Sequence, residues 1–503
     1  MIAHRLGFST ALIERGRHPR FVIGESSTPL ANLLLEEISE EYGLPGIRPL
    51  CKWGTWQKYL PRLGCGLKRG FTFYHHEFDR RLAKDPQRQR QLLVGASPTE
   101  EIADTHWYRP DFDQYLVEQA QSLGVTFWDE TELTMAREET MGMRLSGGRR
   151  GQPRELTAEF VIDASGARGF LFRALGLAEK SFPGFPSTQA LFSHFENVGS
   201  FQAEGSNGAA IPPYPPEQAA VHHVFPGGWI WILRFNNGLT SAGVAATDAV
   251  ADEFGFNSGA SAWQRLLDRL PSVAEIFRGA RATRPFSRLP RIAFQSGVVA
   301  GSRWALLPSA AGFVDPLLST GFALTLLGIT RLGRLLRMNW NKPQLRTELG
   351  SYAEQTELEL ETSFRLVGTL YETMDNFDAF KQLTLLYFAA SSYCETVRRL
   401  GKPDLATGFL LCRHPTFGAQ LRALCEAACE SRPVDAAKLA QRVRAVIEPF
   451  NIAGLTDESR DPFYPALASD LLQNASKLGT SVEEIKLMLR RCGLQRGDLA
   501  SDP

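Results

Sequence analysis

The chain has 503 residues, which is too long for one small core and predicts two or three lobes. Basic and acidic side chains balance at 55 each, so bulk charge gives no reason to expect nucleic acid or an anionic membrane as partner. The apolar runs are too short to span a bilayer, and no basic segment followed by an apolar one opens the chain. We therefore expect a cytoplasmic protein without a membrane span.

Cysteine and histidine usage predicts neither disulfides nor a metal site. The seven cysteines are scattered, their number is odd, and no Cys-x-x-Cys occurs. Two adjacent histidine pairs, His75–His76 and His222–His223, lie in predicted strands. Neighbouring side chains of a strand point to opposite faces, so neither pair suits a shared metal ion.

The first residues resemble part of a dinucleotide-binding unit. Residues 1–6 are expected to end a helix at Gly7, and residues 9–14, STALIE, to form a buried parallel strand ending in Glu14. In such a unit an acid at this place binds the ribose, about 20 residues after the glycine-rich turn. Only 13 residues precede Glu14, so the first strand and the glycine turn are expected to be missing; the unit never had them, or the sequence starts late.

Hydrophobic periodicity predicts an α/β half, an inserted antiparallel sheet and a helical C-terminal third. The predicted elements, in chain order, are an amphipathic helix over 30–45, a strand over 67–78, a strand end, helix and strand over 107–128, an apolar strand ending in Asp-Ala-Ser-Gly over 155–169, a boundary loop over 204–216, a hairpin with an Asn-Asn-Gly turn over 227–246, a return strand and turn over 303–321, and helices from about 322 onward.

Four separated segments together resemble one protein family. They are LIERGRHPRFVIGESSTP (12–29), GLKRGFTF (66–73), GGWIWILRF (227–235) and WALLPSAAGFVDPLLSTG (304–321). Their order and spacing are similar to those of flavin-dependent halogenases of the tryptophan-halogenase type, within the wider flavin monooxygenase and geranylgeranyl-reductase-like group. The resemblance covers roughly residues 1–330.

The resemblance implies an α/β (α+β) fold with an FAD-binding Rossmann-like sheet that lacks its first strand and glycine-rich turn. The implied domains are a discontinuous FAD-binding α/β domain over 1–185 and 285–335, an antiparallel-sheet substrate lobe over 186–284, and a helical C-terminal region over 336–503.

Lys68 aligns with the family's halogenating lysine. An amine at the end of a tunnel can hydrogen-bond hypohalous acid or form a haloamine and aim it at one carbon, and burial would lower the amine pKa and raise its nucleophilicity. The alternative is a surface lysine on an exposed strand face.

The resemblance also implies a set of FAD contacts. They are Glu14, Arg15, Gly24, Glu25, Ser26, Arg109, Asp163, Ser309, Pro316 and Gly321. The alternative for residues 24–29 is an ordinary turn that caps the following helix. At 309 the family has an aspartate that holds a ribityl hydroxyl, and serine would lose about 1.5–3 kcal/mol of charge-assisted hydrogen bonding.

The segment DPLLSTG corresponds to the family's flavin and halide loop. The N–H groups of Thr320 and Gly321, at a helix N-terminus, would bind chloride or bromide; a plain helix cap is the alternative. Tryptophan-specific members carry a glutamate where this chain has Leu318, so a phenol or pyrrole substrate, in some members tethered to a carrier protein, is expected instead of free tryptophan.

Trp229 and Trp231 fall on the family's Trp-x-Trp motif and would border the substrate pocket; simple sheet packing is the alternative. The motif continues with Leu233 and Arg234, where the family has Ile-Pro.

Three hypotheses follow from the sequence. The first is a halogenase that takes reduced FAD from a separate flavin reductase and uses dioxygen and halide on a small aromatic substrate. The second is a flavin monooxygenase or reductase that uses no halide. The third is a non-catalytic paralogue or fragment with impaired FAD binding.

Overall fold

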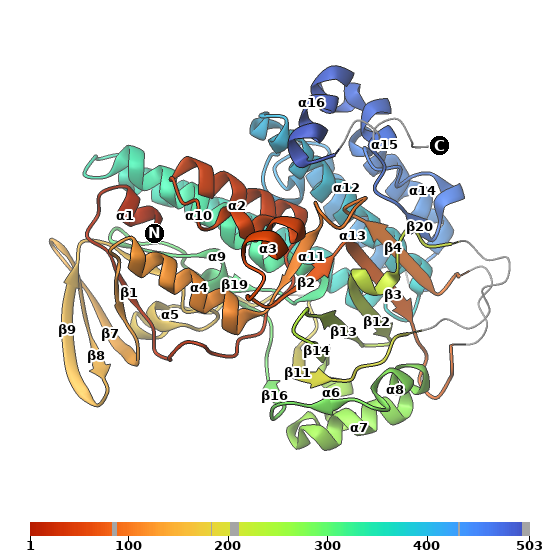
Figure 1. Cartoon of the computed structure of the whole chain (residues 1–503), viewed down its shortest axis with the longest axis horizontal. Helices are drawn as coiled ribbons and strands as arrows, with labels where there is room; N and C mark the ends of the chain where they lie inside the picture. The colour runs from red at the N-terminus through yellow and green to blue at the C-terminus, as the bar shows by residue number, and fades with distance from the viewer. Residues whose placement is uncertain (83–87, 183, 202–210, 431–432, 495–503) are drawn as a thin grey trace.

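The computed structural model describes residues 1–82, 88–182, 184–201, 211–430 and 433–494. It is a mixed α/β structure in which a large sheet separates a helical C-terminal region from a smaller helical layer, with an α/β half at one end (Figure 1).

The large sheet has nine strands in the described part of the chain, in the order β15-β11-β14-β13-β12-β3-β4-β20, with β16 also on β11. Their bounds are β3 Gly70–His75, β4 Gln91–Gly95, β11 Thr188–Glu196, β12 Ala220–Phe225, β13 Gly228–Arg234, β14 Thr240–Thr247, β15 Arg281–Ala282, β16 Ser287–Leu289 and β20 Phe463–Tyr464. The pairs β12–β3 and β20–β4 are parallel and the others antiparallel. The hairpin predicted over 227–246 is confirmed as β13 and β14.

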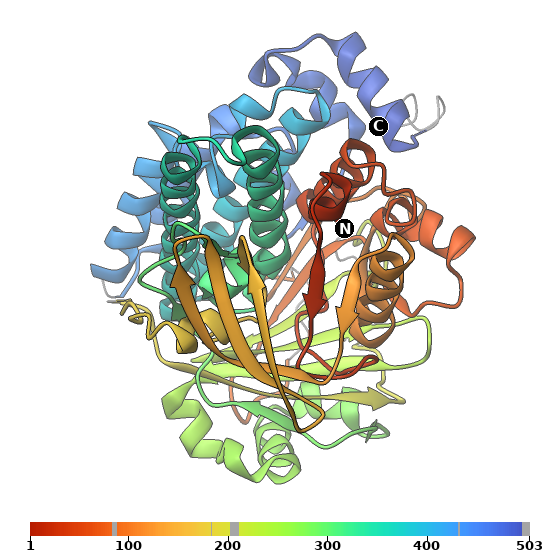
Figure 2. The same ribbon diagram turned by 90° about the vertical axis from the view of Figure 1, so that its left-hand side faces the viewer.

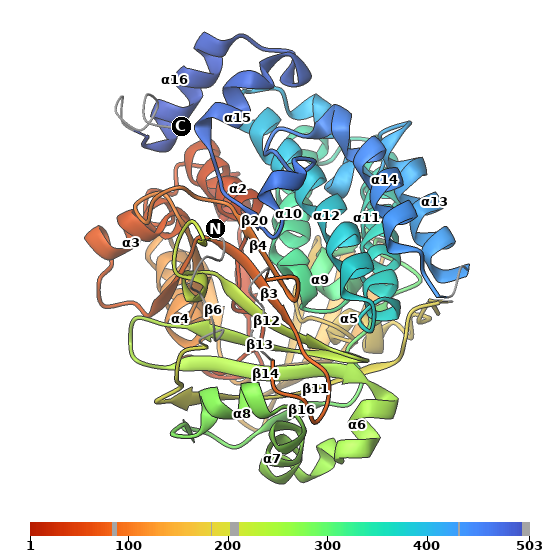
Figure 3. The same cartoon turned by 90° about the vertical axis from the view of Figure 1, so that its right-hand side faces the viewer.

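Both faces of this sheet are covered, which explains why strands such as β3 are buried at every position. On one face lie α6 Asp248–Phe254, α7 Ala260–Arg269 and α8 Pro271–Phe277. On the other lies the helical region (Figure 3). Phe71 and Phe73 pack toward that region, and Tyr74 packs into the opposite core.

The predicted strand over 67–78 is wrong as a single element. The structure divides it at Arg69 into β2 Cys65–Lys68 and β3. The physical reason is a change of partner: β2 pairs antiparallel with β5 Asp104–Trp107 in a separate ladder, whereas β3 joins the large sheet. This division places the side chain of Lys68 in the seam between the two sheets.

Two parallel strand pairs form the α/β half. They are β1 Ala11–Ile13 with β6 Thr126–Trp128, and β10 Val161–Asp163 with β18 Trp304–Leu306. Within the described residues β1 and β10 each have a partner on one side only. Leu12 is 39% exposed and Ile162 40% exposed, so the prediction that residues 9–14 form a buried strand is wrong in burial, although the strand is parallel.

Smaller elements complete this half (Figure 2). They are α1 Ile2–Arg5, α2 Pro29–Glu41, α3 Trp53–Tyr59, α4 Arg109–Ser122, α5 Phe170–Ala174, the three-stranded antiparallel sheet β7 Thr131–Glu139, β8 Gly142–Arg149 and β9 Gln152–Ala158, and the pair β17 Phe294–Gln295 with β19 Gly312–Phe313. The predicted helix over 30–45 corresponds to α2, whose N-cap Thr28 accepts a hydrogen bond from the Ala31 N–H.

The helical C-terminal region is confirmed. Its helices are α10 Thr320–Asn339, α11 Leu345–Glu372, α12 Phe377–Arg399, α13 Phe417–Glu430, α14 Ala436–Ile447, α15 Ala468–Gln473 and α16 Val482–Cys492, and the short α9 Pro308–Ala311 precedes them. None of the helices in the described ranges is both long and apolar enough to cross a membrane. Residues 204–210 of the predicted boundary loop lie outside the described residues, and the predicted domain boundaries stay a prediction.

Gly243 of β14 allows the large sheet to pack closely. A Cβ there would collide with the Phe192 Cβ on β11 and with the Trp231 ring on β13. We expect Gly243→Ala to lower the free energy of unfolding by about 1–3 kcal/mol, measured by urea denaturation. Gly148→Ala, where the nearest atom lies 3.7 Å away, is the control and should change it by less than about 0.5 kcal/mol. Equal effects would contradict this account.

Candidate active site

Lys68 ends β2 and is completely buried. Its Nζ donates hydrogen bonds to Ser26 Oγ at 2.8 Å and to the Ser27 carbonyl at 2.5 Å, and it lies 3.9 Å from the centroid of the Phe71 ring. In the β2–β5 ladder Lys68 stands directly opposite Asp104. The surface-lysine alternative is therefore wrong in this structure, because the seam between two sheets encloses the side chain.

The electrostatics of this seam are set by burial. Burial lowers the pKa of the Lys68 amine, and the Asp104 charge opposes that shift. Burial raises the pKa of the Asp104 carboxyl, opposed by Lys68 and by the Asn32 amide. Burial and the Lys68 charge also lower the pKa values of His106 and His222. The neutral amine is thus more populated at neutral pH than in an exposed lysine, which makes it a nucleophile.

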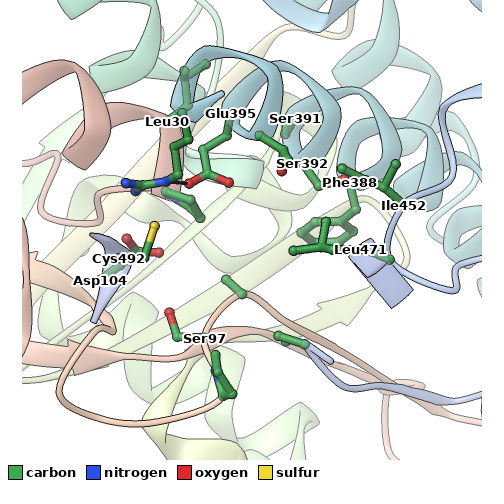
Figure 4. Close-up of a pocket in the computed structure, with 18 of the residues that line it drawn as sticks. Leu30, Ser97, Asp104, Phe388, Ser391, Ser392, Glu395, Ile452, Leu471 and Cys492 are labelled. Atoms are coloured by element: carbon green, nitrogen blue, oxygen red, sulfur yellow. Dashed lines mark hydrogen bonds and ion pairs between the residues drawn. The ribbon is translucent and has the colours of Figure 1, made fainter. Parts of the chain in front are cut away.

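A cavity of about 190 Å³ is lined in part by Asp104, the residue opposite Lys68 in the β2–β5 ladder (Figure 4). Two side chains that line the cavity are also neighbours of Lys68. They are Phe71, whose ring covers the amine, and Asp104. Apolar walls come mainly from Leu30, Val94, Tyr387, Phe388, Ile452 and Leu471. Polar groups on the walls are Ser97, Asp104, Ser391, Ser392 and Glu395. An engineered apolar cavity of about 150 Å³ holds benzene, so this volume suits a substituted single ring.

Trp229 is held in a buried hydrogen-bond network. Its Nε1 donates to Asp315 Oδ1 and contacts Tyr371 Oη, both at 3.2 Å, and Tyr371 donates to Asp315 Oδ2 at 2.9 Å. The Leu317 N–H donates to Asp315 Oδ1 at 2.9 Å. Burial raises the pKa of Asp315 to about 7, against the hydrogen bonds that favour its charge. The network ties the large sheet and α11 to the loop before α10.

The three residues predicted for the substrate pocket do not line this cavity. Trp229, Trp231 and Leu318 are 1%, 4% and 0% exposed and lie in the core. Trp231 Nε1 donates to Ser241 Oγ at 3.2 Å, so its polar atom is used inside the sheet. Arg234, the departure from the family motif, donates to the carbonyls of residues 198 and 199 and anchors that loop.

The predicted halide residues lie at the start of α10. Pro316 begins the turn, and Leu318 and Ser319 have positive φ angles of 67° and 54°. Such left-handed residues cost about 1–2 kcal/mol each and are retained where the surroundings require the shape. No side-chain hydrogen bond caps α10, so the N–H groups of Thr320 and Gly321 have no capping acceptor.

The predicted flavin contacts at 24–26 are close to Arg109. Gly24 has a φ of +95°, and its carbonyl accepts a hydrogen bond from Arg109 Nη1 at 2.9 Å. Glu25 is 2% exposed; its Oε1 lies 2.8 Å from His194 Nε2, and its Oε2 has no partner in the described protein. Ser26 accepts the hydrogen bond from the lysine amine. These residues therefore link the candidate cofactor contacts to Lys68.

Several other predicted contacts are engaged within the protein. Glu14 accepts from the Gly16 N–H at 2.7 Å and pairs with Arg20 at 3.2 Å, and Arg15 is exposed. Asp163 accepts from the Ser165 and Leu171 N–H groups, each at 2.7 Å, and so closes its own turn.

Ser309 is different, because no side-chain hydrogen bond of its hydroxyl is found among the described residues. It lies in α9, which follows β18 directly. The turn that the sequence analysis singled out is thus in place, with a hydroxyl free to bind a ligand group.

Sequence reasoning missed Asp104, Asp315, Tyr371 and His194. Asp315 stood within the quoted DPLLSTG segment, but nothing in the pattern indicated that a tryptophan and a tyrosine would bond to it. Asp104 has no recognisable motif around it, and its importance comes only from the pairing of β5 with β2. In the described residues no cluster could hold a metal ion, and all seven cysteines are free.

Comparison with known proteins identifies the family and the fold. The family described as tryptophan halogenase matches residues 81–382. Monodechloroaminopyrrolnitrin halogenase PrnC of Pseudomonas fluorescens is 28% identical over 390 residues, covering 75% of this chain and 66% of PrnC. Tetracycline 7-halogenase of Kitasatospora aureofaciens is 28% identical over 403 residues, covering 76% and 69%. The chain thus spans about two thirds of these relatives.

Solved structures show the same fold. Halogenase PltM, in complex with phloroglucinol and FAD, superimposes with a TM-score of 0.80 at 23% identity, over 92% of this chain and 96% of PltM. The flavin-dependent brominase Bmp2 has a TM-score of 0.60 at 16% identity, over 85% of this chain and 94% of Bmp2. Because the family match extends over more than half of the chain, the protein belongs to the tryptophan halogenase family of flavin-dependent enzymes.

Proposed function

We propose that this protein uses reduced FAD, dioxygen and chloride or bromide to halogenate a small electron-rich aromatic of the phenol or pyrrole type. The observation that carries the proposal is the fully buried amine of Lys68 beside a mainly apolar cavity sized for one substituted ring. A buried amine of lowered pKa has no obvious structural purpose, because burying it costs stability.

The described residues fit the flavin end of FAD. Among the described residues, Glu25 Oε2 and both amide atoms of Gln295 are buried without hydrogen-bond partners. We assign Gly24, Glu25 and Ser309 as flavin contacts, with Gly321 at the start of α10. Bound reduced FAD would supply, with dioxygen, the oxidising equivalent that converts a halide ion to hypohalous acid.

The start of α10 supplies the halide site in this proposal. The N–H groups of Thr320 and Gly321 and the helix dipole favour an anion there. Asp315 fixes the preceding loop through Trp229 and Tyr371, so Trp229 acts by holding this loop. The role of Trp229 in this chain is then to position the backbone N–H groups that bind the halide.

Lys68 carries the halogen from oxidant to substrate. The neutral amine attacks hypohalous acid: an N–halogen bond forms, the O–halogen bond breaks, and hydroxide leaves with the displaced amine proton as water. The aromatic carbon then attacks the halogen, the N–halogen bond breaks, and the ring proton returns to the amine. Burial excludes water and so contains the oxidant.

Partners follow from the same proposal. Reduced flavin would come from a separate reductase. Among the relatives, PltM binds phloroglucinol, and the 1H-pyrrole-2-carbonyl-[peptidyl-carrier protein] chlorinase of Pseudomonas fluorescens, 25% identical over 335 residues, is named for a carrier-bound pyrrole. The cavity's volume favours a single-ring substrate for this chain.

Lys68→Met tests the proposal directly, because methionine keeps an unbranched side chain but cannot form a haloamine. With a flavin reductase present, we expect halogenated phenol to fall by more than about 100-fold while FAD binding is unchanged. Product is measured by mass spectrometry with isotopically resolved halide. Lys58→Met, on the exposed end of α3, is the control and should keep activity. Retained halogenation in Lys68→Met would refute the assignment.

FAD binding provides a second prediction. Ser309→Asp restores the charge-assisted acceptor found in the family, so we expect FAD to bind about 10- to 100-fold more tightly. The measurement is quenching of flavin fluorescence during titration. A wild-type chain that binds no FAD, together with no gain in the variant, would favour the non-catalytic hypothesis.

Tyr371→Phe removes one hydrogen bond to Asp315 and should loosen the halide loop. We expect the KM for halide to rise several-fold while the KM for the aromatic substrate stays constant, with stability lowered by about 1 kcal/mol. Tyr352→Phe is the matched control: Tyr352 is also buried on α11 and donates one hydrogen bond, to the Leu306 carbonyl, away from this loop. An equal change in halide KM in both variants would contradict the role of Asp315.

A further inference from the structure

We propose that Asp104 is a further catalytic residue, which accepts a hydrogen bond from the O–H or N–H group of a neutral aromatic substrate in the cavity and holds that proton while the ring attacks the halogen. This inference rests on the proposed function for its chemistry. It assigns to the cavity one specific recognition group and one class of substrate.

The first argument is an oxygen without a partner. Asp104 is 5% exposed, and its Oδ1 accepts a hydrogen bond from Asn32 Nδ2 at 2.9 Å. Its Oδ2 has no hydrogen-bond partner in the described protein, although the side chain lines the cavity. A buried acceptor left unpaired is costly, and more so when it is charged. A hydrogen-bond donor on a bound ligand would satisfy this oxygen.

The second argument is position. Asp104 stands opposite Lys68 in the β2–β5 ladder, and directly opposed residues have Cβ atoms about 4.5–5.5 Å apart. A ring whose donor binds Asp104 would therefore be held beside the strand that carries Lys68. Figure 4 shows Asp104 at one end of the cavity, near Ser97, with Ser391 and Ser392 of α12 across from it.

The third argument is charge. Two carboxylates, Asp104 and Glu395, line the cavity. The two cationic groups on the described wall are engaged: Arg399 bonds to Glu395 and Glu36, and Lys52 donates to the Cys492 carbonyl. The two carboxylates and the two cations of the wall balance in charge, so no net charge on the wall calls for an ionic substrate. The unpaired Asp104 Oδ2 favours a ring that donates a hydrogen bond.

The chemistry balances without a further reagent. As the ring carbon bonds to halogen, the N–halogen bond of Lys68 breaks and the ring C–H proton passes to its nitrogen, so that a neutral amine leaves. During the attack, electron density flows from the phenolic oxygen, whose proton shifts toward Asp104 Oδ2 and returns to the oxygen when the aromatic ring is restored. A ring that shares its proton in this way is a stronger nucleophile, which is what electrophilic substitution requires.

The test compares phenol with anisole, its methyl ether, which cannot donate. Binding is measured by ligand-observed NMR on the full chain, without halide or flavin. We expect wild type to prefer phenol by about 10- to 100-fold and Asp104→Asn to lose that preference. The control is Asp248→Asn: Asp248 also accepts one side-chain amide hydrogen bond, from Gln189 at 2.8 Å, and does not line the cavity. It should keep the preference.

Turnover provides the readout that a purely structural role would not change. With flavin reductase and bromide, Asp104→Asn should lower kcat/KM for phenol by about 10- to 100-fold and leave that for anisole unchanged. Formation of hypohalous acid, measured with a cyclic 1,3-diketone trap, should be equal in both proteins.

The outcomes separate the two proposals. A wild type that halogenates neither phenol nor the trap contradicts the proposed function, whereas the binding preference still decides the role of Asp104. A wild type that binds phenol and anisole equally overturns the role of Asp104 even if the variant does not fold. So does an Asp104→Asn protein that keeps the preference.

Discussion

The burial of one ammonium group is the constraint on which the rest of the site depends. Lys68 is enclosed because β2 and β3 belong to different sheets, and its amine is held by Ser26, the Ser27 carbonyl and the face of Phe71. Asp104 is the acidic residue that pairs with Lys68 in the β2–β5 ladder. Separating the pair from water lowers the pKa of the amine and raises that of the carboxyl, so both groups can exchange protons near neutral pH.

A second buried carboxylate organises the opposite end of the candidate chemistry. Asp315 joins a tryptophan of the large sheet, a tyrosine of α11 and the backbone of the loop before α10. Three parts of the chain that are far apart in sequence thus share one acceptor. The hydrogen bond from the motif tryptophan thus ties the large sheet to the loop before α10.

Much of the fold could be predicted from the sequence because its signals are local. The Asn-Asn-Gly turn between alternating strands identified β13 and β14, and Thr28-Pro29 before an apolar stripe identified α2. Lys68, Thr320 and Gly321 were singled out through short motifs, and their roles stay predictions. Asp104 and Tyr371 could not be found in this way, because their importance arises from the pairing of β5 with β2 and from the packing of α11 against a loop. The division at Arg69 could not be predicted, because apolar side chains fall on odd-numbered positions in both strands.

The composition of the cavity wall has a consequence for the working life of the protein. Phe71 and Phe388 are unactivated rings that resist electrophilic halogen, but Tyr387, Met488 and Cys492 line the same space. Thioethers and thiols are the side chains most readily oxidised, and a phenol is itself a substrate analogue. Oxidant that misses its target would therefore first convert Met488 and Cys492 to oxidised sulfur and then modify Tyr387. Under the proposed function, damage would thus collect on this wall, and sooner when the aromatic substrate is scarce.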